Sequence, residues 1–219
     1  MKPKILFLHG SGTNPLIFRI QSRTLLSLLS PHFELVFLPG FHECPPGPGV
    51  LPFFEGAEPY LKWLDDSTPH EEEVHWPELV RLVDEVEKQG PFVGVVGFSQ
   101  GAKAGMELVR YLENREREMR FWVGVCGTAP FQGGQDKKRE GGYRESLRLG
   151  TVNKTESFHV IGEGDPWRGE SEALVGFFDG GGGDERKKKV RRVEGGHQMP
   201  LGKGVNREVV EWILGACRL

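Results

Sequence analysis

The sequence is poor in cysteine and in long apolar runs. Its 219 residues include only three cysteines, Cys44, Cys126 and Cys217, an odd set with no metal-ligand spacing. Such a set predicts reduced thiols rather than a disulfide framework. No apolar stretch is long enough to span a bilayer, and the one that follows Met1–Lys4 is too short for the core of a signal peptide. We therefore expect a cytoplasmic protein with no membrane partner.

An excess of charge of one sign is also missing. The chain has 28 Lys and Arg against 31 Asp and Glu, a net charge of −3, and its basic residues are spread along the sequence. The one dense basic run, Arg186–Arg192, lies beside a glycine tract and is typical of a solvated loop and strand edge. This balance argues against a nucleic-acid partner.

Motifs for metal and phosphate binding are absent from the sequence. His70 and His75 lie five residues apart, a spacing that would not place them on one helical face, and no H-E-x-x-H motif occurs. The glycines at 180–183 have no lysine-threonine pair after them and lack the strand-to-helix setting of a phosphate loop. We expect no metal and no other cofactor.

What the sequence does have is an alternation of strand-like and helix-like segments. Apolar runs typical of buried parallel strands occur at 4–8, 34–38, 92–98, 121–126 and 158–161, and the segment 189–193 is expected to form a short last strand. Apolar residues recur at helical spacing at 15–29, 76–86, 102–112, 171–178 and 205–216. The alternation predicts one α/β domain over residues 1–219, with about six mainly parallel strands and helices on both faces. Its functional site is expected at the carboxyl ends of the strands.

The sequence Gly97-Phe98-Ser99-Gln100-Gly101 is a G-x-S-x-G motif between a valine-rich run and an amphipathic helix. Nucleophilic chemistry needs a serine on a sharp strand-to-helix turn, with Oγ clear of the backbone and a helix N-terminus close behind. The flanking glycines lack Cβ atoms where strand and helix would collide. The motif alone could be a chance match, but its setting predicts that Ser99 is a nucleophile.

A serine nucleophile needs a base to take its proton and an acid to orient that base. In hydrolases of this architecture the three residues follow the order Ser, Asp or Glu, His. Asp165 follows the fifth strand and His197 the sixth, each in a glycine-flanked turn. Either residue alone could be an ordinary turn or surface residue, but together they predict the acid and the base. Glu163 and Asp179 are the alternatives to Asp165.

The oxyanion of a tetrahedral intermediate needs backbone donors. The N–H of Gln100, directly after the nucleophile, is one expected donor, and the turn after the first strand should supply another. Ser11, which follows His9-Gly10, is the residue predicted for that second donor.

A proline- and glycine-rich segment at 39–59 interrupts the alternation. Its six prolines fix φ and remove backbone donors, so neither a helix nor a central strand is expected there. Its phenylalanines are Phe41, Phe53 and Phe54. We predict that the segment forms a wall or lid over the site and that these three side chains bind the substrate. A loop fixed to the core by the same phenylalanines is the alternative.

Motifs along nearly the whole chain match one family. They are LHGSGTN at 8–14, FHECPPGPGV at 41–50, GFSQG at 97–101, GEGDP at 162–166 and GGHQMP at 195–200. On these motifs the chain resembles the FSH-type serine hydrolases, single-domain α/β-hydrolases common in fungi. The resemblance implies an α/β-hydrolase fold, a triad of Ser99, Asp165 and His197, and an acyl pocket bordered by the proline-rich loop. The members that look most like this chain are similar to hydrolases encoded beside polyketide synthases, which release acyl chains from a carrier-protein thioester.

The preferred hypothesis is a serine hydrolase that acts through an acyl-Ser99 intermediate. Its substrate would be a small-molecule acyl ester or the thioester of an acyl carrier protein, and the apolar loop favours a polyketide-type or other medium-length chain. Two alternatives stay open. The same triad could transfer the acyl group to an alcohol or close a lactone, or the fold could serve to bind a ligand without catalysis.

Overall fold

The structure, a computed structural model, describes residues 1–64, 76–128, 151–178 and 187–218. The glycine tract at 180–183 and Asp179, one of the two alternatives to Asp165, lie outside the described residues.

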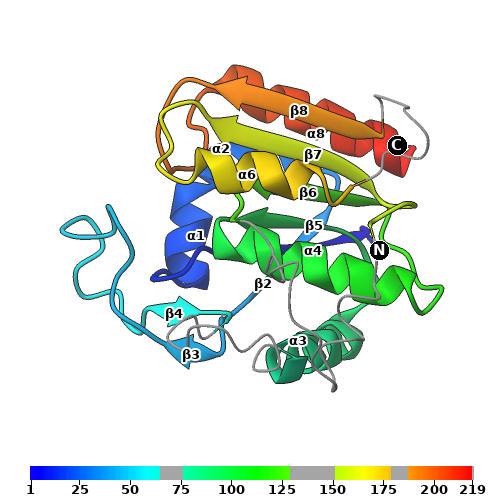
Figure 1. The fold of residues 1–219 in the computed structure, drawn as a ribbon, viewed down its shortest axis with the longest axis horizontal. Coiled ribbons are helices and arrows are strands. Elements are labelled where there is room, and N and C mark those ends of the chain that lie inside the picture. Colours follow the sequence, from blue (N-terminus) through cyan, green and yellow to red (C-terminus); the bar gives the residue numbers. More distant parts are fainter. Residues whose placement is uncertain (65–75, 129–150, 179–186, 219) are drawn as a thin grey trace, which may run out of the picture.

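Six parallel strands form one sheet, which confirms the predicted architecture (Figure 1). They are β1 (Lys4–Leu8), β2 (Glu34–Leu38), β5 (Phe92–Phe98), β6 (Phe121–Val125), β7 (Glu156–Gly162) and β8 (Lys188–Val193). Their order is β2-β1-β5-β6-β7-β8, and every neighbouring pair is parallel. The chain moves outward from β1 to β2 and returns to β5 on the other side of β1. Ligands of open α/β sheets bind at the carboxyl ends of the strands beside such a reversal.

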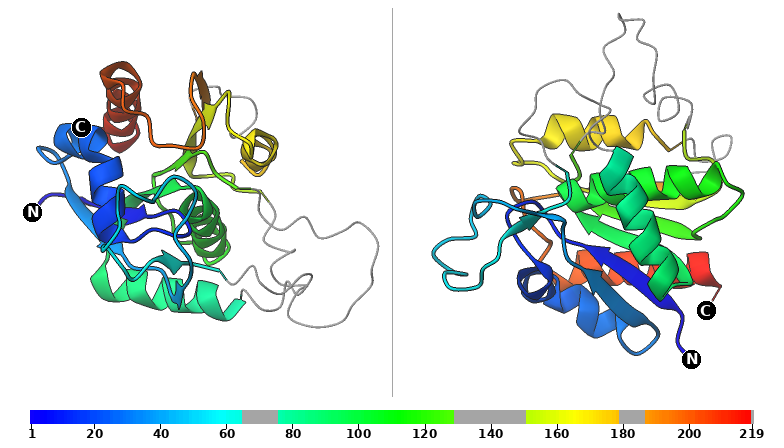
Figure 2. Two further views of the ribbon diagram at one scale, coloured as in Figure 1. Left: turned by 90° about the vertical axis from the view of Figure 1, so that its left-hand side faces the viewer. Right: turned by 90° about the horizontal axis from the view of Figure 1, so that it is seen from below.

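Helices cover both faces of the sheet. They are α1 (Pro15–Gln21), α2 (Arg23–Leu29), α3 (Trp76–Gln89), α4 (Gln100–Glu113), α6 (Arg168–Val175) and α8 (Lys203–Cys217). Figures 1 and 2 show α3, α4 and α6 on one face and α1, α2 and α8 on the other. Successive strand residues supply the two cores: Trp122 packs with the α4 side and Phe121 with the α8 side. None of the helices in the described residues combines the length and the apolar character that a transmembrane segment needs.

The single helix predicted over 15–29 is two helices, and this prediction was wrong at Ser22. The chain leaves helical geometry there, with φ −95° and ψ 8°, and the Ser22 hydroxyl donates to Phe18 O. A serine hydroxyl that bonds back to a carbonyl competes with the regular helix ladder. The break separates α1, beside the site, from α2, which packs against α8.

The proline-rich segment forms neither a helix nor a strand of the central sheet, as predicted. Near its start, β3 (His42–Glu43) pairs antiparallel with β4 (Leu61–Lys62), which follows the segment. Leu61 also exchanges backbone hydrogen bonds with the turn after β1, through Gly12 N and Thr13 O. Pairing is possible because no proline lies within either strand: Pro39 precedes β3, and the other five prolines lie between β3 and β4. The segment therefore braces the turn after β1.

A buried histidine lies within β7. The His159 ring packs against the rings of Trp122 and Phe178, with centroids 4.8 and 5.1 Å away, and its Nε2 is 3.1 Å from Ser157 Oγ. Burial lowers the pKa of His159 to about 3, with a smaller contribution from the positive charge of Lys188. The folded protein therefore keeps this ring neutral at pH values where an exposed histidine takes up a proton.

Stability in acid should depend on this ring. Because the pKa of His159 is about 3 in the folded protein and about 6.5 in the unfolded chain, only the unfolded chain binds the proton between these values. We expect the free energy of unfolding to fall as the pH drops through this window, by about 1.4 kcal/mol per pH unit from this group. Urea titrations at pH 6.5 and pH 5 should show a smaller loss in His159→Gln than in the wild type.

The matched control is His32→Gln, because His32 is exposed on the surface. Its loss of stability between the two pH values should equal that of the wild type. Equal losses in the wild type and His159→Gln would contradict the assignment of acid sensitivity to His159.

Candidate active site

Ser99 occupies the turn between β5 and α4. Its backbone has φ 53° and ψ −123°, which places it in a region that non-glycine residues rarely adopt. The backbone on each side of Ser99 approaches a neighbouring segment closely: Gly97 lies against α4, and Gly101 lies against the end of β1. A Cβ at Gly97 would lie 2.5 Å from the Ala102 backbone, and one at Gly101 would lie 2.2 Å from Leu8 O. Glycine is therefore required at both positions, and the turn has the geometry of a nucleophile elbow.

Three predicted site residues meet above the carboxyl ends of the strands. Ser99 Oγ lies 2.9 Å from His197 Nε2, and His197 Nδ1 lies 2.8 Å from Asp165 Oδ2. The second oxygen of Asp165 accepts a hydrogen bond from Trp167 N at 2.8 Å. Because a carboxylate can only accept, His197 Nδ1 carries the proton and Nε2 is left to accept from the Ser99 hydroxyl. This is the proton arrangement that activates a serine.

The two acidic residues in the described part of the chain that could orient His197, Asp165 and Glu163, differ in burial. The Asp165 side chain is fully buried and that of His197 is 15% exposed. Glu163, the other alternative within the described residues, is exposed. The turns that carry Asp165 and His197 contact one another directly, since Gly164 N donates to Gly195 O at 2.8 Å. The structure thus places Asp165, and not Glu163, against the imidazole.

Cys126 lies beneath the turn that carries His197. Its thiol is 3.8 Å from both Gly196 O and Gln198 O, the carbonyls on either side of His197. Burial raises the pKa of this thiol to about 11, so it is protonated at neutral pH. The cysteines were predicted to be reduced, but no sequence pattern places residue 126 near residue 197, so a position of Cys126 beside the site could not be predicted.

One group of side chains in the described residues has metal-ligand chemistry. Ligand atoms of Cys126, Asp165 and His197 all lie within 4.8 Å of one another. Zinc needs a thiolate and a histidine nitrogen that is not protonated. Here the thiol holds its proton, and the carboxylate and the imidazole already bind each other at 2.8 Å. The donor set is arranged for proton transfer rather than for holding a metal.

The two residues predicted to supply oxyanion donors both line the pocket that contains Ser99 and His197. The Gln100 side chain is engaged elsewhere, since its Oε1 accepts from Trp63 N at 2.7 Å and its Nε2 donates to Leu64 O at 3.2 Å. It therefore holds the segment after β4 against the start of α4. The chemistry predicted for Gln100 and Ser11 is that of their backbone N–H groups.

A buried histidine that the sequence analysis left without a role holds the turn of Ser11 in place. His9 Nδ1 donates to Gly10 O at 2.8 Å, and His9 Nε2 accepts from Gly40 N at 2.9 Å. Trp63 Nε1 donates to His9 O at 2.7 Å. Burial lowers the pKa of His9 to about 4, so the ring is neutral and keeps one donor and one acceptor. The sequence feature that could have indicated this role is the position of His9 directly after β1, at the start of the glycine-containing turn.

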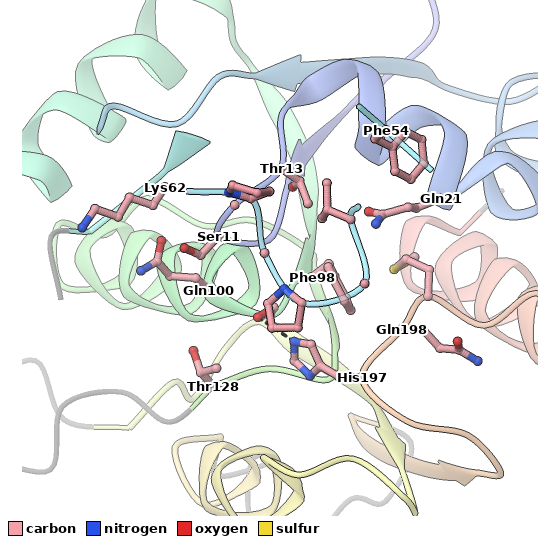
Figure 3. Close-up of a pocket in the computed structure, with 18 of the residues that line it drawn as sticks. Ser11, Thr13, Gln21, Phe54, Lys62, Phe98, Gln100, Thr128, His197 and Gln198 are labelled. Carbon is pink, nitrogen blue, oxygen red and sulfur yellow. Dashed lines mark hydrogen bonds between the residues drawn. The ribbon is translucent and has the colours of Figure 1, made fainter. Parts of the chain in front are cut away.

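A cavity of about 1080 Å³ opens beside Ser99 (Figure 3). It is large enough for a drug-sized ligand. Phe53 and Phe54 line it, as predicted, and Phe53 is 83% exposed. Several lining side chains were not predicted from the sequence: Ile20, Gln21, Trp167, Met199 and Leu201. Apolar side chains thus form much of the wall.

Phe41 is not among the residues that line this cavity, so the structure places it apart from Phe53 and Phe54. Its ring packs edge-on against Trp63, with centroids 5.4 Å apart, and the Arg81 guanidinium lies 4.4 Å from its centroid. The cause is backbone pairing: Phe41 N donates to Lys62 O, which sets Phe41 beside the residue after β4. For this phenylalanine the alternative, a side chain that fixes the loop to the core, is correct.

Sequence comparison places the chain among serine hydrolases. A family profile described as serine hydrolase (FSH1) matches residues 1–209. The chain is 34% identical to esterase FUS5 of Gibberella moniliformis, over 97% of this chain and 86% of that protein. It is 33% identical to thioesterase FSL2 of Gibberella zeae, over 97% of this chain and 91% of that protein.

Solved structures share the fold at lower identity. A carboxylesterase of Bacillus cereus aligns with a TM-score of 0.61 at 23% identity, covering 98% of this chain and 89% of the other. The acyl-protein thioesterase 2 of Zea mays aligns with a TM-score of 0.62 at 16% identity, covering 99% and 94%. At these identities the likeness shows the fold alone.

Proposed function

The chain belongs to the serine hydrolase (FSH1) family, and on that premise we propose that Ser99, His197 and Asp165 are its catalytic triad. The observation that carries the proposal is the chain of hydrogen bonds from Asp165 through His197 to Ser99 Oγ, at 2.8 and 2.9 Å. The strained turn at Ser99 and the cavity beside it support the same assignment.

The mechanism follows from the positions of the donors and acceptors. His197 Nε2 takes the Ser99 proton as Oγ attacks the acyl carbonyl carbon, and backbone N–H groups of Ser11 and Gln100 stabilise the oxyanion. His197 then gives the proton to the leaving alcohol or thiol, which leaves an acyl-Ser99 ester. Water attacks this ester by the same route and releases the free acid. Asp165 keeps the imidazole oriented and stabilises its positive charge.

The proposed substrate is an acyl thioester or ester whose chain occupies the apolar part of the cavity. Ile20, Phe53, Phe54 and Leu201 line that part and would bury the chain. Two relatives are named as an esterase (FUS5) and a thioesterase (FSL2), which supports an ester or a thioester as the bond that is cleaved. Release of a polyketide-type chain from an acyl carrier protein is the specific form of this proposal.

The experiment uses octanoyl thioester of N-acetylcysteamine and the matching oxygen ester with purified protein. We expect free octanoic acid by mass spectrometry and labelling of Ser99 by a fluorophosphonate, located by peptide mapping. Release of free acid supports hydrolysis. An ester of an added alcohol as the main product would favour acyl transfer instead. Unlabelled Ser99 together with no product from either substrate would favour a protein that only binds its ligand.

A further inference from the structure

Gln21 is one of several polar side chains in the wall of the cavity, which also include Thr13, Arg23, Lys62, Thr128 and Gln198. Gln21, the last residue of α1, lines the cavity together with Ile20, Phe54 and Met199. Figure 3 shows the Gln21 amide pointing from its helix toward the centre of the lining residues. In that view Gln21 and Phe54 lie on the opposite side of the lining from Gln100. The amide is therefore placed along the part of the cavity that an acyl chain would occupy, away from the oxyanion donors.

The Gln21 amide is incompletely satisfied. Its Oε1 is shielded from solvent, and it receives no hydrogen bond from the described part of the chain. A buried acceptor without a partner typically costs about 1–3 kcal/mol, so such an atom calls for an explanation. The other unpartnered buried atom in the described residues, Glu78 Oε2, belongs to a carboxylate that binds His42 through Oε1 and is not among the cavity residues.

The neighbours of Gln21 leave its amide free to form a hydrogen bond with a polar group on an acyl chain. Phe54 and Met199 offer no strong hydrogen-bond donor to the amide. Because Oε1 is shielded, the NH₂ group is the part of the amide that a ligand can reach in this conformation. Rotation about χ3, a broad torsion, would bring the oxygen to the cavity instead. A hydroxyl group both donates and accepts, and it would therefore pair with the amide in either orientation.

We propose that Gln21 selects acyl chains that carry a hydroxyl group, by hydrogen bonding to that hydroxyl in the cavity. This inference rests on the proposed function, since it assumes that the acyl chain of the substrate occupies the cavity beside Ser99. It narrows the substrate class from acyl chains in general to hydroxylated ones. A plain chain would leave the amide unpaired against apolar carbon, which lowers its reactivity relative to the hydroxylated chain.

The test compares octanoyl thioesters of N-acetylcysteamine that are plain or carry one hydroxyl at the third, fifth or seventh carbon. For the wild type we expect kcat/KM to be about 10-fold higher for at least one hydroxylated isomer than for the plain chain. Gln21→Met keeps the length of the side chain and removes its hydrogen-bonding groups. It should lose that preference, so that kcat/KM for the hydroxylated isomer falls to the level of the plain chain.

The matched control is Gln89→Met, because Gln89 ends α3 and is not among the cavity residues. It should keep the wild-type preference. The proposal is overturned if the wild type cleaves the plain chain and all three isomers equally well, or if Gln21→Met keeps the full preference. Mass spectrometry separates free acid from lactone, so an internal attack by the substrate hydroxyl is not counted as hydrolysis.

Binding provides a readout that needs no turnover. The thermal shift caused by the preferred hydroxylated octanoic acid should exceed that caused by octanoic acid in the wild type, and this difference should vanish in Gln21→Met. Equal shifts for the two acids in the wild type would overturn the Gln21 assignment. Loss of thioester cleavage with the difference in binding intact would instead count against the proposed catalysis, while it supports the recognition of hydroxylated chains.

Discussion

Ser99→Ala is expected to lower kcat for acyl thioesters by on the order of 10⁶-fold, the scale measured when a triad serine is removed. The reason is that Oγ is the atom proposed to form the acyl-enzyme, and alanine leaves no nucleophile at the end of β5. The fold should be unaffected, because Ser99 Oγ contacts His197 and the turn itself is set by close backbone approach at Gly97 and Gly101. Steady-state hydrolysis and fluorophosphonate labelling both measure the effect.

Ser27→Ala is the matched control for this change. Ser27 is exposed on α2, and its hydroxyl only donates to Thr24 O, within its own helix. Its kcat should equal that of the wild type. Undiminished turnover by a correctly folded Ser99→Ala protein would remove the covalent mechanism and leave another group to be found as the nucleophile.

Asp165→Asn is expected to lower kcat by about 10⁴-fold, the scale measured when the acid of a serine triad is replaced by its amide. The hydrogen bonds of Asp165 explain this. Its Oδ1 accepts from Trp167 N at 2.8 Å, and an asparagine would keep its oxygen there. The NH₂ group would then face His197 Nδ1, which could no longer donate. The proton would have to move to Nε2, and His197 could not accept from Ser99.

The effect is measured as kcat and as the rate of fluorophosphonate labelling of Ser99, and both should fall together. Asp84→Asn, at an exposed position on α3, makes the same chemical change away from the site and should leave both rates unchanged. Thermal unfolding would show whether Asp165→Asn is folded. A folded variant with activity within about tenfold of the wild type would contradict the proposed role of Asp165.

Much of this fold is readable from the sequence because its signals are local. Buried parallel strands are continuous apolar runs, and the elbow needs a serine between glycines at a strand end. The structure of residues 92–105 can therefore be predicted from that stretch of sequence alone. Asp165 and His197 could be predicted for a related reason: in a parallel sheet, turns at the carboxyl ends of strands lie at one edge. The structure brings both residues to Ser99.

Features that the sequence did not predict depend on contacts that no local pattern specifies. Phe41 and Phe53 lie in the same proline-rich segment, yet one packs on Trp63 and the other lines the cavity. Their directions depend on the pairing of β3 with β4, and no local pattern specifies that pairing. The break at Ser22 has a similar origin, because a serine within an apolar periodic stretch is compatible with a continuous helix as well as with a bend.

The sequence by itself determined the order of strands and helices, the elbow and the identity of the residues proposed to activate Ser99, because these depend on neighbouring residues and on the edge where parallel strands end. Only the tertiary structure decided which side chains form the cavity and how His9 and Gln100 hold the turns around Ser99. Those features join segments far apart in the chain, and the packing that joins them exists only once the whole sheet and its covering helices are assembled.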